Sequence, residues 1–200
     1  MPRQVDHAGR RRLIAEAVCR LADERGLEGV TLRDVAARAE VSMGAVQRCF
    51  RTKEEMLVFT LGHIGERVVG RVRAGLAGSP ARSAGAALGH AATEVALLRE
   101  EHRAEARVWL AFLAQAAVSE TLAATLRADY APLEEAFTRL VAEAAGGTDR
   151  AAPLDARREA RTLLALADGL TAHVLIGRLT SREAQEVLQA QVDGLRGAGT

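Results

Sequence analysis

The sequence has few aromatic residues, few prolines, two cysteines and a single lysine. Aromatic residues make up 3% of the 200 residues and prolines number four, whereas alanine and leucine dominate. Strands draw on aromatic and β-branched residues, so this composition favours helices packed by aliphatic side chains over a sandwich or barrel. The lone lysine stands against 26 arginines, an imbalance that we attribute to genomic base composition.

Long apolar runs and paired cysteines are also missing. No run approaches the roughly 18 apolar residues that a membrane span needs, and the charged N-terminal segment does not have the pattern of a signal peptide. Cys19 and Cys49 lie far apart without CxxC spacing, as expected of reduced thiols. We therefore expect a cytoplasmic protein with no membrane segment.

Charge is spread unevenly along a chain whose net charge is only +1. Residues 1–53 hold eleven Arg or Lys against seven Asp or Glu, a net charge of +4, and the remainder carries −3. The whole molecule is thus not the basic body of a nonspecific nucleic-acid coat. Its basic end is compatible with a module that faces phosphate.

Hydrophobic periodicity predicts an all-α chain of about nine helices. Three [ST]-x-x-[DE] capping pairs mark helix starts, namely Thr31 with Asp34, Thr52 with Glu55 and Thr180 with Glu183. The helices are predicted at 7–25, 32–39, 43 to 49 or 50, 53–76, 84–101, 104–118, 119–145, 154–177 and 181–195. Pro132 should kink the seventh helix, and residues 146–153 read as a loop.

The three short helices of the first fifty residues fit a helix-turn-helix. Small residues are needed where two helix backbones meet at a tight turn, and Ala36 and Ala39 supply them. Apolar residues occupy the positions beneath the turn and the second helix, namely Val35, Val41, Val46 and Phe50. The outer face is free of bulky apolar groups apart from the flexible Met43. This pattern predicts a recognition helix that starts after Ser42.

The stretch "GLEGVTLRDVAARAEVSMGAVQRCFRTKEEML" resembles the N-terminal signature of the TetR family of bacterial transcriptional regulators. The likeness is strong over residues 10–61, and the C-terminal half is weakly similar to the BetI-like branch. The resemblance implies a helix-turn-helix DNA-binding domain at 1–52 and a larger helical ligand-binding and dimerisation domain at 53–200. It implies a homodimer on a pseudo-palindromic double-stranded DNA operator, acting as a repressor released by a small-molecule effector.

Family positions map onto nine candidate DNA contacts, namely Thr31, Arg33, Ser42, Met43, Gly44, Ala45, Gln47, Arg48 and Lys53. Arg33 is placed to grip a guanine edge or a phosphate, although a solvated helix charge explains it too. Ser42 caps the recognition helix and lies where the family touches phosphate. Met43 and Ala45 are candidates for thymine methyl contacts, and Gly44 allows close approach.

The remaining DNA candidates are polar, and two positions depart from the family pattern. Arg48 is the best polar candidate on the recognition helix, and Lys53 matches the family lysine that binds backbone phosphate. Gln47 stands where most members carry tyrosine, so the aromatic surface is lost. Glu40 stands where the turn usually has glycine, and a left-handed backbone there would cost roughly 1 kcal/mol.

Scarce aromatic residues gather on the sixth to eighth predicted helices and suggest an effector site. The candidates are Trp109, Phe112, Leu113, Tyr130, Phe137 and His173. A small-ligand site is usually an apolar cavity with a few polar groups, yet each aromatic residue is explained equally well as core. Asp168 and His173 lie in an otherwise apolar helix, so each needs a polar partner if buried.

The last two predicted helices carry apolar residues at helical spacing. These are Leu163, Leu166, Leu170 and Val174 on one helix, and Val187, Leu188, Val192 and Leu195 on the other. Two such helices from each of two subunits would form a four-helix interface with twofold symmetry. The same residues could instead pack within one chain, and the family resemblance favours the dimer.

Other functions have weaker support in the sequence. The five histidines show no metal-ligand spacing and no glycine-rich phosphate loop occurs, so we expect neither metal, cofactor nor enzymatic activity. Asp168 and His173, five residues apart on one helix, point to different sides. The alternative function is a helical small-molecule-binding protein or enzyme without operator binding. Cys49 could sense redox state, but a small buried apolar residue explains it better.

Overall fold

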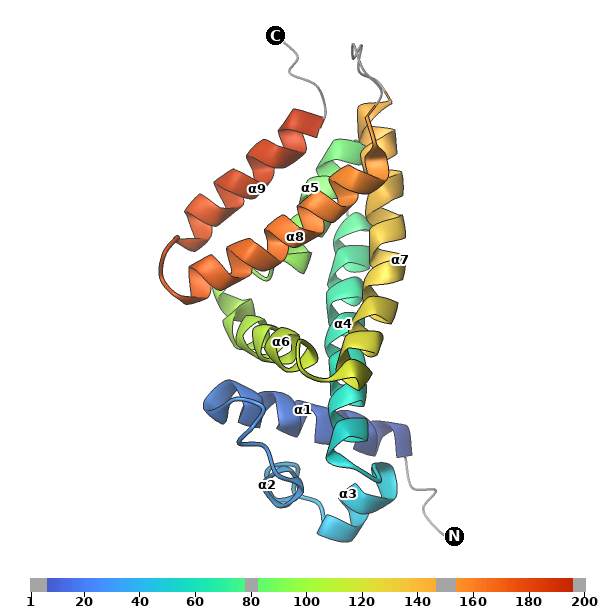
Figure 1. The fold of residues 1–200 in the computed structure, drawn as a ribbon, viewed down its shortest axis with the longest axis vertical. Coiled ribbons are helices and arrows are strands. Elements are labelled where there is room, and N and C mark those ends of the chain that lie inside the picture. The colour runs from blue at the N-terminus through green and yellow to red at the C-terminus, as the bar shows by residue number, and fades with distance from the viewer. Residues whose placement is uncertain (1–6, 78–82, 147–153, 196–200) are drawn as a thin grey trace. The chain divides into compact units, whose positions relative to one another are not determined.

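The computed structural model describes residues 7–77, 83–146 and 154–195, and within these ranges it is all helical (Figure 1). The elements are α1 (His7–Arg25), α2 (Leu32–Arg38), α3 (Met43–Cys49), α4 (Lys53–Ala77), α5 (Ala84–Val95), the 3-10 helix η1 (Glu100–His102), α6 (Arg103–Ala116), α7 (Glu120–Ala145), α8 (Ala156–Leu175) and α9 (Ser181–Leu195). These ranges contain nine α-helices and no strand, so the predicted all-α class is confirmed.

The described residues divide into two compact units. Unit 1 contains the chain up to Glu66 together with Arg107–Arg127, and unit 2 contains Arg67–Ala106 and the chain from Ala128 onward. The functional boundary predicted after residue 52 falls inside unit 1. Helices α4, α6 and α7 each contribute residues to both units.

In unit 1, α1, α2 and α3 pack on one another. Their contact surfaces are aliphatic: Ile14, Val18, Val35 and Val46 are fully buried, and Phe50 is 1% exposed. Val35, Val46 and Phe50 therefore occupy the core positions that the helix-turn-helix pattern assigns to them. A Leu, Val or Phe side chain contributes about 1.5–3 kcal/mol when fully buried, which makes this small core the main support of two seven-residue helices.

The turn between α2 and α3 has Schellman geometry. The Glu40 N–H donates to the Ala37 carbonyl at 3.2 Å, and the Val41 N–H donates to the Ala36 carbonyl at 3.0 Å. Glu40 has a φ of +54°, so the non-glycine residue adopts the left-handed conformation that was expected to cost roughly 1 kcal/mol. The hydrogen bonds at the end of α2 hold it there.

Side-chain caps fix the helix starts. Thr31 Oγ1 accepts from the Asp34 N–H at 3.2 Å, and Ser42 Oγ accepts from the Ala45 N–H at 3.2 Å. Thr52 with Glu55 and Thr180 with Glu183 form the same bond at 3.0 and 3.2 Å. All three predicted capping pairs are confirmed. Each satisfies a backbone N–H that has no acceptor within its own helix.

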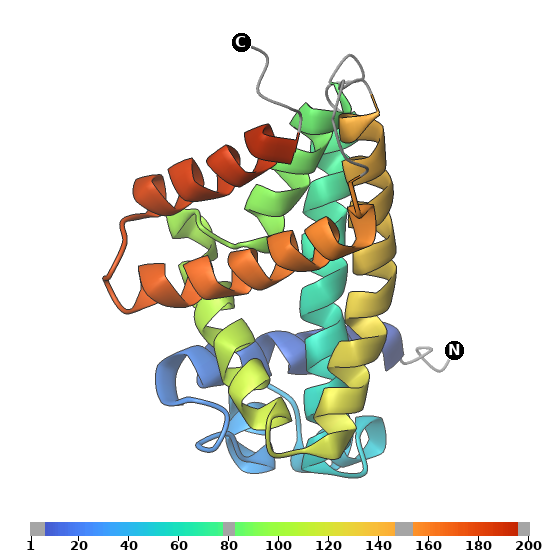
Figure 2. The ribbon, with the colours of Figure 1, turned by 45° about the horizontal axis from the view of Figure 1, so that its top comes forward.

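In unit 2, α5, α8 and α9 pack against one another (Figure 2). Their shared core is built from buried alanine, leucine and valine with Phe137 of α7, and it includes Leu88, Ala92, Leu163, Leu188 and Val192. The small alanines let the helices approach closely, which is how a chain with 3% aromatic residues fills its core.

The predicted fifth helix, 84–101, is too long. Helix α5 ends at Val95, and Leu97 adopts a φ of +49° before η1 begins. The buried Thr171 hydroxyl of α8 shares its one hydrogen between the Ala96 carbonyl at 2.6 Å and the Ala167 carbonyl of its own helix at 2.8 Å. A tertiary hydrogen bond thus holds a turn in residues whose local propensities favour a helix. Helix α7 continues past Pro132.

An ionic network in unit 2 pairs two buried carboxylates with partly exposed arginines. Glu94 of α5 is 2% exposed, and its carboxylate meets Arg71 Nε of α4 at 3.1 Å and Arg99 Nη2 at 2.9 Å. Arg71 also bonds both oxygens of Glu105 on α6, at 3.1 and 2.9 Å. Burial, helped by Arg71, lowers the pKa of the neighbouring His102. Each buried charge is paired, as burial in a low-dielectric interior requires.

Candidate nucleic-acid interface and effector site

The first turn of α3 has an open amide end and an exposed outer surface. Ser42 caps it, and no acidic residue lies in this first turn, so the positive end of the helix dipole is free to face an anion. Met43 is 39% exposed, and Gln47 and Arg48 are exposed. An ideal Cβ placed on Gly44 would lie 3.5 Å from Arg48 Nη1, so the arginine lies across the glycine.

Ala45 does not belong to this outer surface. It is 6% exposed and lies on the buried side of α3 with Val46. Its methyl group therefore faces the helix-turn-helix core and not a thymine, which corrects the role predicted for it. Position 45 takes alanine because the space beneath the helix is small.

Helix α2 presents Thr31 and Arg33 as exposed residues. None of the ion pairs among the described residues includes Arg33. The helix is tied to α1 by Arg38, whose Nη1 and Nη2 donate to the two carboxylate oxygens of Glu24 at 2.6 and 2.8 Å. This hydrogen bond lowers the pKa of Glu24. The bidentate pair fixes the direction in which α2 holds Arg33.

Lys53 has a contact that the sequence does not reveal. Its Nζ donates to the Leu27 carbonyl at 3.2 Å and to the Glu28 carbonyl at 3.4 Å. The ammonium thus joins the start of α4 to the link between α1 and α2. An ammonium has three donors, so one donor is left for a phosphate. A slim point charge fits between two carbonyls better than a planar guanidinium.

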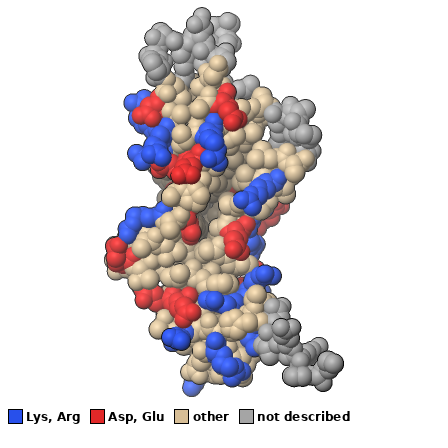
Figure 3. Space-filling model, turned by 90° about the vertical axis from the view of Figure 1, so that its right-hand side faces the viewer, with Lys and Arg blue, Asp and Glu red and all other residues tan. Residues whose placement is uncertain are grey.

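Basic side chains gather at the end of the chain's first unit. At the lower end of the face drawn in Figure 3, most of the charged atoms are blue. Arg51, which the sequence interpretation passed over, is exposed in the junction between α3 and α4. The sequence could have identified Arg51 as a candidate, because it lies two residues before Lys53 and between two capped helices. Arg48, Arg51 and Lys53 thus follow the open N-terminus of α3 within one short segment, and such cations are what a phosphate backbone binds.

The six predicted effector residues are divided between the two units. Trp109, Phe112 and Leu113 lie in unit 1, whereas Tyr130, Phe137 and His173 lie in unit 2. Phe112 is fully buried and Phe137 is 2% exposed, as core residues are. His173 is only half-buried, and its Nε2 lies 3.2 Å from Arg178 Nη1.

Asp168 lies in the otherwise apolar α8, where a polar partner was expected. That partner is Tyr130. The Tyr130 hydroxyl of α7 donates to the Asp168 carboxylate of α8. Burial raises the pKa of Tyr130, and the neighbouring negative charge raises it further. Asp168 therefore has a partner within the chain, and the pair puts a carboxylate at the edge of the unit 2 core.

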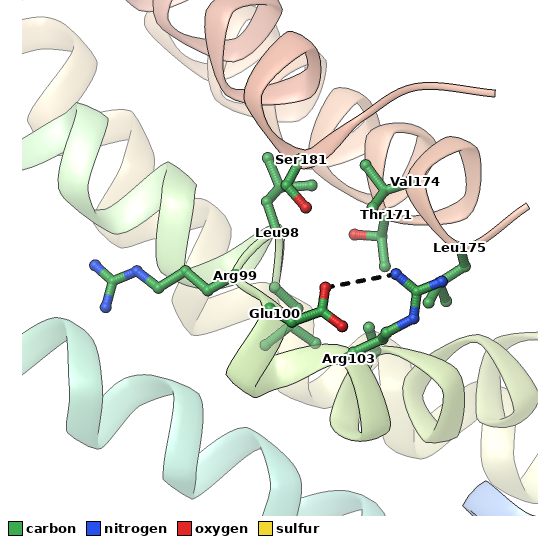
Figure 4. Close-up of a pocket in the computed structure, with 10 residues that line it drawn as sticks. Leu98, Arg99, Glu100, Arg103, Thr171, Val174, Leu175 and Ser181 are labelled. Atoms are coloured by element: carbon green, nitrogen blue, oxygen red, sulfur yellow. Dashed lines mark ion pairs between the residues drawn. The ribbon is translucent and has the colours of Figure 1, made fainter. Parts of the chain in front are cut away.

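A small pocket opens in unit 2 beside the turn that follows α5 (Figure 4). Apolar side chains from three elements form its wall, and Glu100, Arg103, Thr171 and Ser181 supply polar groups. Glu100 and Arg103 are ion-paired at 3.6 Å. The cavity measures about 10 Å³, room for about one water molecule. None of the six predicted effector residues lines it.

Most of the predicted dimer residues are buried within the chain. Leu163, Leu170, Leu188, Val192 and Leu195 are at most 4% exposed and belong to the unit 2 core. Leu166 and Val174 are half-buried, and Val187 is 44% exposed. The five buried residues thus follow the intrachain alternative. The exposed residues of α8 include Thr162, Ala165 and Gly169 beside Arg161, and those of α9 include Val187, Ala190 and Gly194 beside Glu186 and Asp193.

Two further observations concern other functions. In the part of the chain that the structure describes, no three His, Cys, Asp or Glu side chains are placed to hold a metal ion, and no helix has the length and apolarity of a membrane span. Cys49 is 5% exposed and packs as a small apolar residue on the inner side of α3.

Two family models match the chain. The model described as bacterial regulatory proteins, tetR family, matches residues 14–58, and the model described as BetI-type transcriptional repressor, C-terminal, matches residues 84–197. The HTH-type transcriptional regulator PksA of Bacillus subtilis is 30% identical over 197 residues, which cover 98% of this chain and 94% of that protein.

Two other relatives agree with these matches. The HTH-type transcriptional regulator BetI of Burkholderia thailandensis is 33% identical over 164 residues, covering 80% of this chain and 79% of that protein. A crystal structure of a transcriptional regulator from Rhodococcus sp. Rha1 superposes with a TM-score of 0.79 at 30% identity, covering 92% of this chain and 95% of that chain.

Proposed function

Because this chain belongs to the TetR family of bacterial transcriptional regulators and carries a BetI-type repressor domain, we propose that it binds a pseudo-palindromic operator as a homodimer and leaves it when a small effector binds. The chain is a helix-turn-helix DNA-binding regulator. The observation that carries the proposal is the first turn of α3, with its uncontested amide end and exposed Met43, Gln47 and Arg48.

The contacts divide into base readers and phosphate binders. Arg33 and Arg48 are exposed and read base edges in the major groove, where an arginine binds guanine O6 and N7 bidentately. Met43 contacts a thymine methyl, and Gly44 lets the helix come close. Phosphates are bound by Thr31, Ser42, Gln47 and Lys53. Arg51, exposed beside them, joins this group.

Dimerisation uses the outward faces of α8 and α9. Thr162, Ala165 and Gly169 repeat at helical spacing on α8, and Val187, Ala190 and Gly194 do so on α9. Small residues let helices of two subunits approach closely, and Val187 at 44% exposure adds apolar area. Ile176, 74% exposed at the end of α8, extends this face. Twofold symmetry then places two recognition helices about 34–36 Å apart, one turn of DNA.

Effector binding acts through helices that have residues in both units. Helix α4 begins with Lys53 and continues to Arg71, which is bonded to Glu94 and Glu105. We expect the effector to enter unit 2 near Tyr130 and Asp168, because the cavity beside Thr171 has room for only about one water molecule. A shift of α4 would then change the separation of the recognition helices, with a coupling of roughly 1–3 kcal/mol.

The DNA-binding proposal is tested by selection of duplexes from a random-sequence library, followed by binding to DNA upstream of the protein's own gene. We expect the selected sequences to be pseudo-palindromic. Arg33→Met and Arg48→Met should each relax the preference at particular base pairs, by about 1–3 kcal/mol for a lost bidentate contact. The matched control is Arg127→Met on α7, a surface arginine outside the helix-turn-helix. Selection of no sequence by the wild-type protein at low salt would refute the proposal.

A further inference from the structure

Arg11 of α1 is held between two aromatic rings. Its guanidinium carbon lies 4.6 Å from the ring centroid of Phe50 and 4.4 Å from that of Phe59. The two rings are themselves in contact, with centroids 5.5 Å apart and planes inclined at 52°. Phe50 is the residue that ends α3, and Phe59 lies on α4. One cation thus touches the end of the recognition helix and the helix that follows it.

The same guanidinium faces a carboxylate that orders the α3–α4 junction. Arg11 Nη2 lies 3.6 Å from Glu55 Oε1. The other oxygen of that carboxylate, Oε2, accepts the Arg51 N–H at 2.8 Å, while the Glu55 N–H is capped by Thr52. Arg11 therefore fixes the carboxylate that fixes the backbone of Arg51. This junction also ends at Lys53.

From these contacts we infer that Arg11 is a positioning residue for DNA binding, which sets the direction of the α3–α4 junction without contacting DNA itself. The inference rests on the proposed operator binding. Through Phe50 it orients the end of α3, and through Glu55 it orients the backbone that presents Arg51 and Lys53 to phosphate. A shift of about 1 Å at such a junction would misplace the recognition helix against base edges.

Arginine is the side chain that can make all these contacts together. A planar guanidinium stacks on two rings at once and still directs one edge to a carboxylate, whereas an ammonium is a compact, strongly hydrated charge. Arg11 Nε is buried and has no hydrogen-bond partner among the described residues, so the two rings and Glu55 are the contacts that hold the guanidinium. Lysine at this position would keep the charge and lose the stack.

The test compares Arg11→Lys and Arg11→Met with Arg12→Met, a control at an exposed neighbour on the same helix. The probe is a duplex that the wild-type protein selects from a random library. Both Arg11 variants should bind it about tenfold more weakly. Any fall in the slope of log affinity against log salt should be the same in the two variants, because it comes from the displaced Arg51 and Lys53 and not from the charge at position 11. Arg12→Met should keep wild-type preference for the selected duplex over unrelated DNA.

Amide hydrogen exchange without DNA separates positioning from a loss of overall stability. In both Arg11 variants the Arg51 amide should exchange at least about tenfold faster, while the amide of Val18, deep in α1, should keep its wild-type rate. Equal acceleration of both amides would mean that Arg11 only stabilises the unit, and the inference would fail.

Two results with DNA would also overturn it. If Arg11→Lys binds like wild type while Arg11→Met lowers the salt slope by about 0.9, Arg11 contacts a phosphate directly. If both variants bind the selected duplex like wild type, the stack has no role in DNA binding. Failure of the wild-type protein to select any duplex would instead refute the proposed function, while hydrogen exchange would still report on the junction.

Discussion

The helix-turn-helix segment and the α8–α9 pair solve opposite packing problems. The first consists of two seven-residue helices whose directions are fixed by caps, a Schellman turn, the Arg38–Glu24 pair and the Lys53 ammonium. The second consists of longer helices, of 20 and 15 residues, held by a broad core of aliphatic side chains. Short helices are not stable alone, so the helix-turn-helix needs these specific polar contacts in addition to its small apolar core, whereas the second region depends on buried area.

This difference determines in which region the role of a single side chain can be identified. In the first region the polar side chains named above either make a structural contact or lie on the surface proposed to face DNA, so each substitution should have a distinct effect. In the second region the core takes most of the apolar stripe, and the proposed dimer face consists of small exposed residues and Val187. Four substitutions test this contrast.

The largest effect is expected for Leu163→Ala in the α8–α9 core. Leu163 is fully buried, so its truncation should cost about 2–5 kcal/mol in the free energy of unfolding. Thermal or urea unfolding measures this loss. Leu13→Ala on α1, where the leucine is 56% exposed, is the matched control and should stay within about 0.5 kcal/mol of wild type. A small loss of stability would contradict the role of Leu163 in the chain's own core and would favour a place in the dimer interface.

Lys53→Gln should give the next largest effect, and it acts on DNA. The variant loses the cation and weakens the bonds to the Leu27 and Glu28 carbonyls. We expect all duplexes to bind about 10- to 100-fold more weakly, with the salt slope reduced by about 0.9. Fluorescence anisotropy over a salt series measures both quantities. Weaker binding with an unchanged slope would show that Lys53 acts only through the two carbonyls.

Glu40→Gly should stabilise the protein slightly. The left-handed φ of +54° at Glu40 is strained for a residue with a Cβ, and glycine should recover about 1 kcal/mol. Glu40→Ala removes the acid but keeps the strain, so its unfolding free energy should stay near the wild-type value. If alanine stabilises as much as glycine does, charge and not backbone conformation accounts for the gain.

The smallest effect is expected on the pKa of Tyr130, at the edge of the unit 2 core. Tyr130 is the only tyrosine in the chain, so absorbance near 295 nm reports its ionisation alone. Burial and Asp168 raise its pKa, and a raised pKa contributes stability below the unfolded value of about 10. This stability is lost as the pH rises further. Tyrosinate should form only together with alkaline unfolding.

Asp168→Asn sharpens this test because it removes the negative charge but keeps a hydrogen-bond acceptor. The variant should ionise at lower pH than wild type, while burial still keeps the pKa raised. A wild-type tyrosine that titrates near pH 10 while the protein stays folded would contradict the burial of this pair.

Sequence alone predicted unit 1 well because its signals are local. The pairs Thr31–Asp34 and Thr52–Glu55 marked the starts of α2 and α4, and α1 has its predicted bounds, His7–Arg25. The same kind of local signal, Thr180 with Glu183, marked the start of α9 in unit 2. Ala45 was misjudged because a seven-residue helix has a narrow outer face. The end of α5 at Val95 was missed because it depends on Thr171, 75 residues away along the chain.

The α8–α9 region shows a limit of a different kind. Helical spacing places Leu163 and Leu188 on apolar stripes, but such a stripe looks the same whether it covers the chain's own core or a second subunit. Only the packing of α5 against both helices decides between them. The contacts of Arg11 and Lys53 were hidden for a related reason, since each joins segments distant in sequence.

The central claim, two recognition helices held one DNA turn apart by a dimer, is tested most directly by changing the spacing of the half-sites. Wild-type protein is titrated against its selected duplex and against the same duplex with five base pairs inserted at the centre. The insertion turns one half-site to the opposite side of the DNA, so affinity should fall to the level of unrelated DNA, at least about 10³-fold at physiological salt. Equal affinity for the two duplexes would contradict the account.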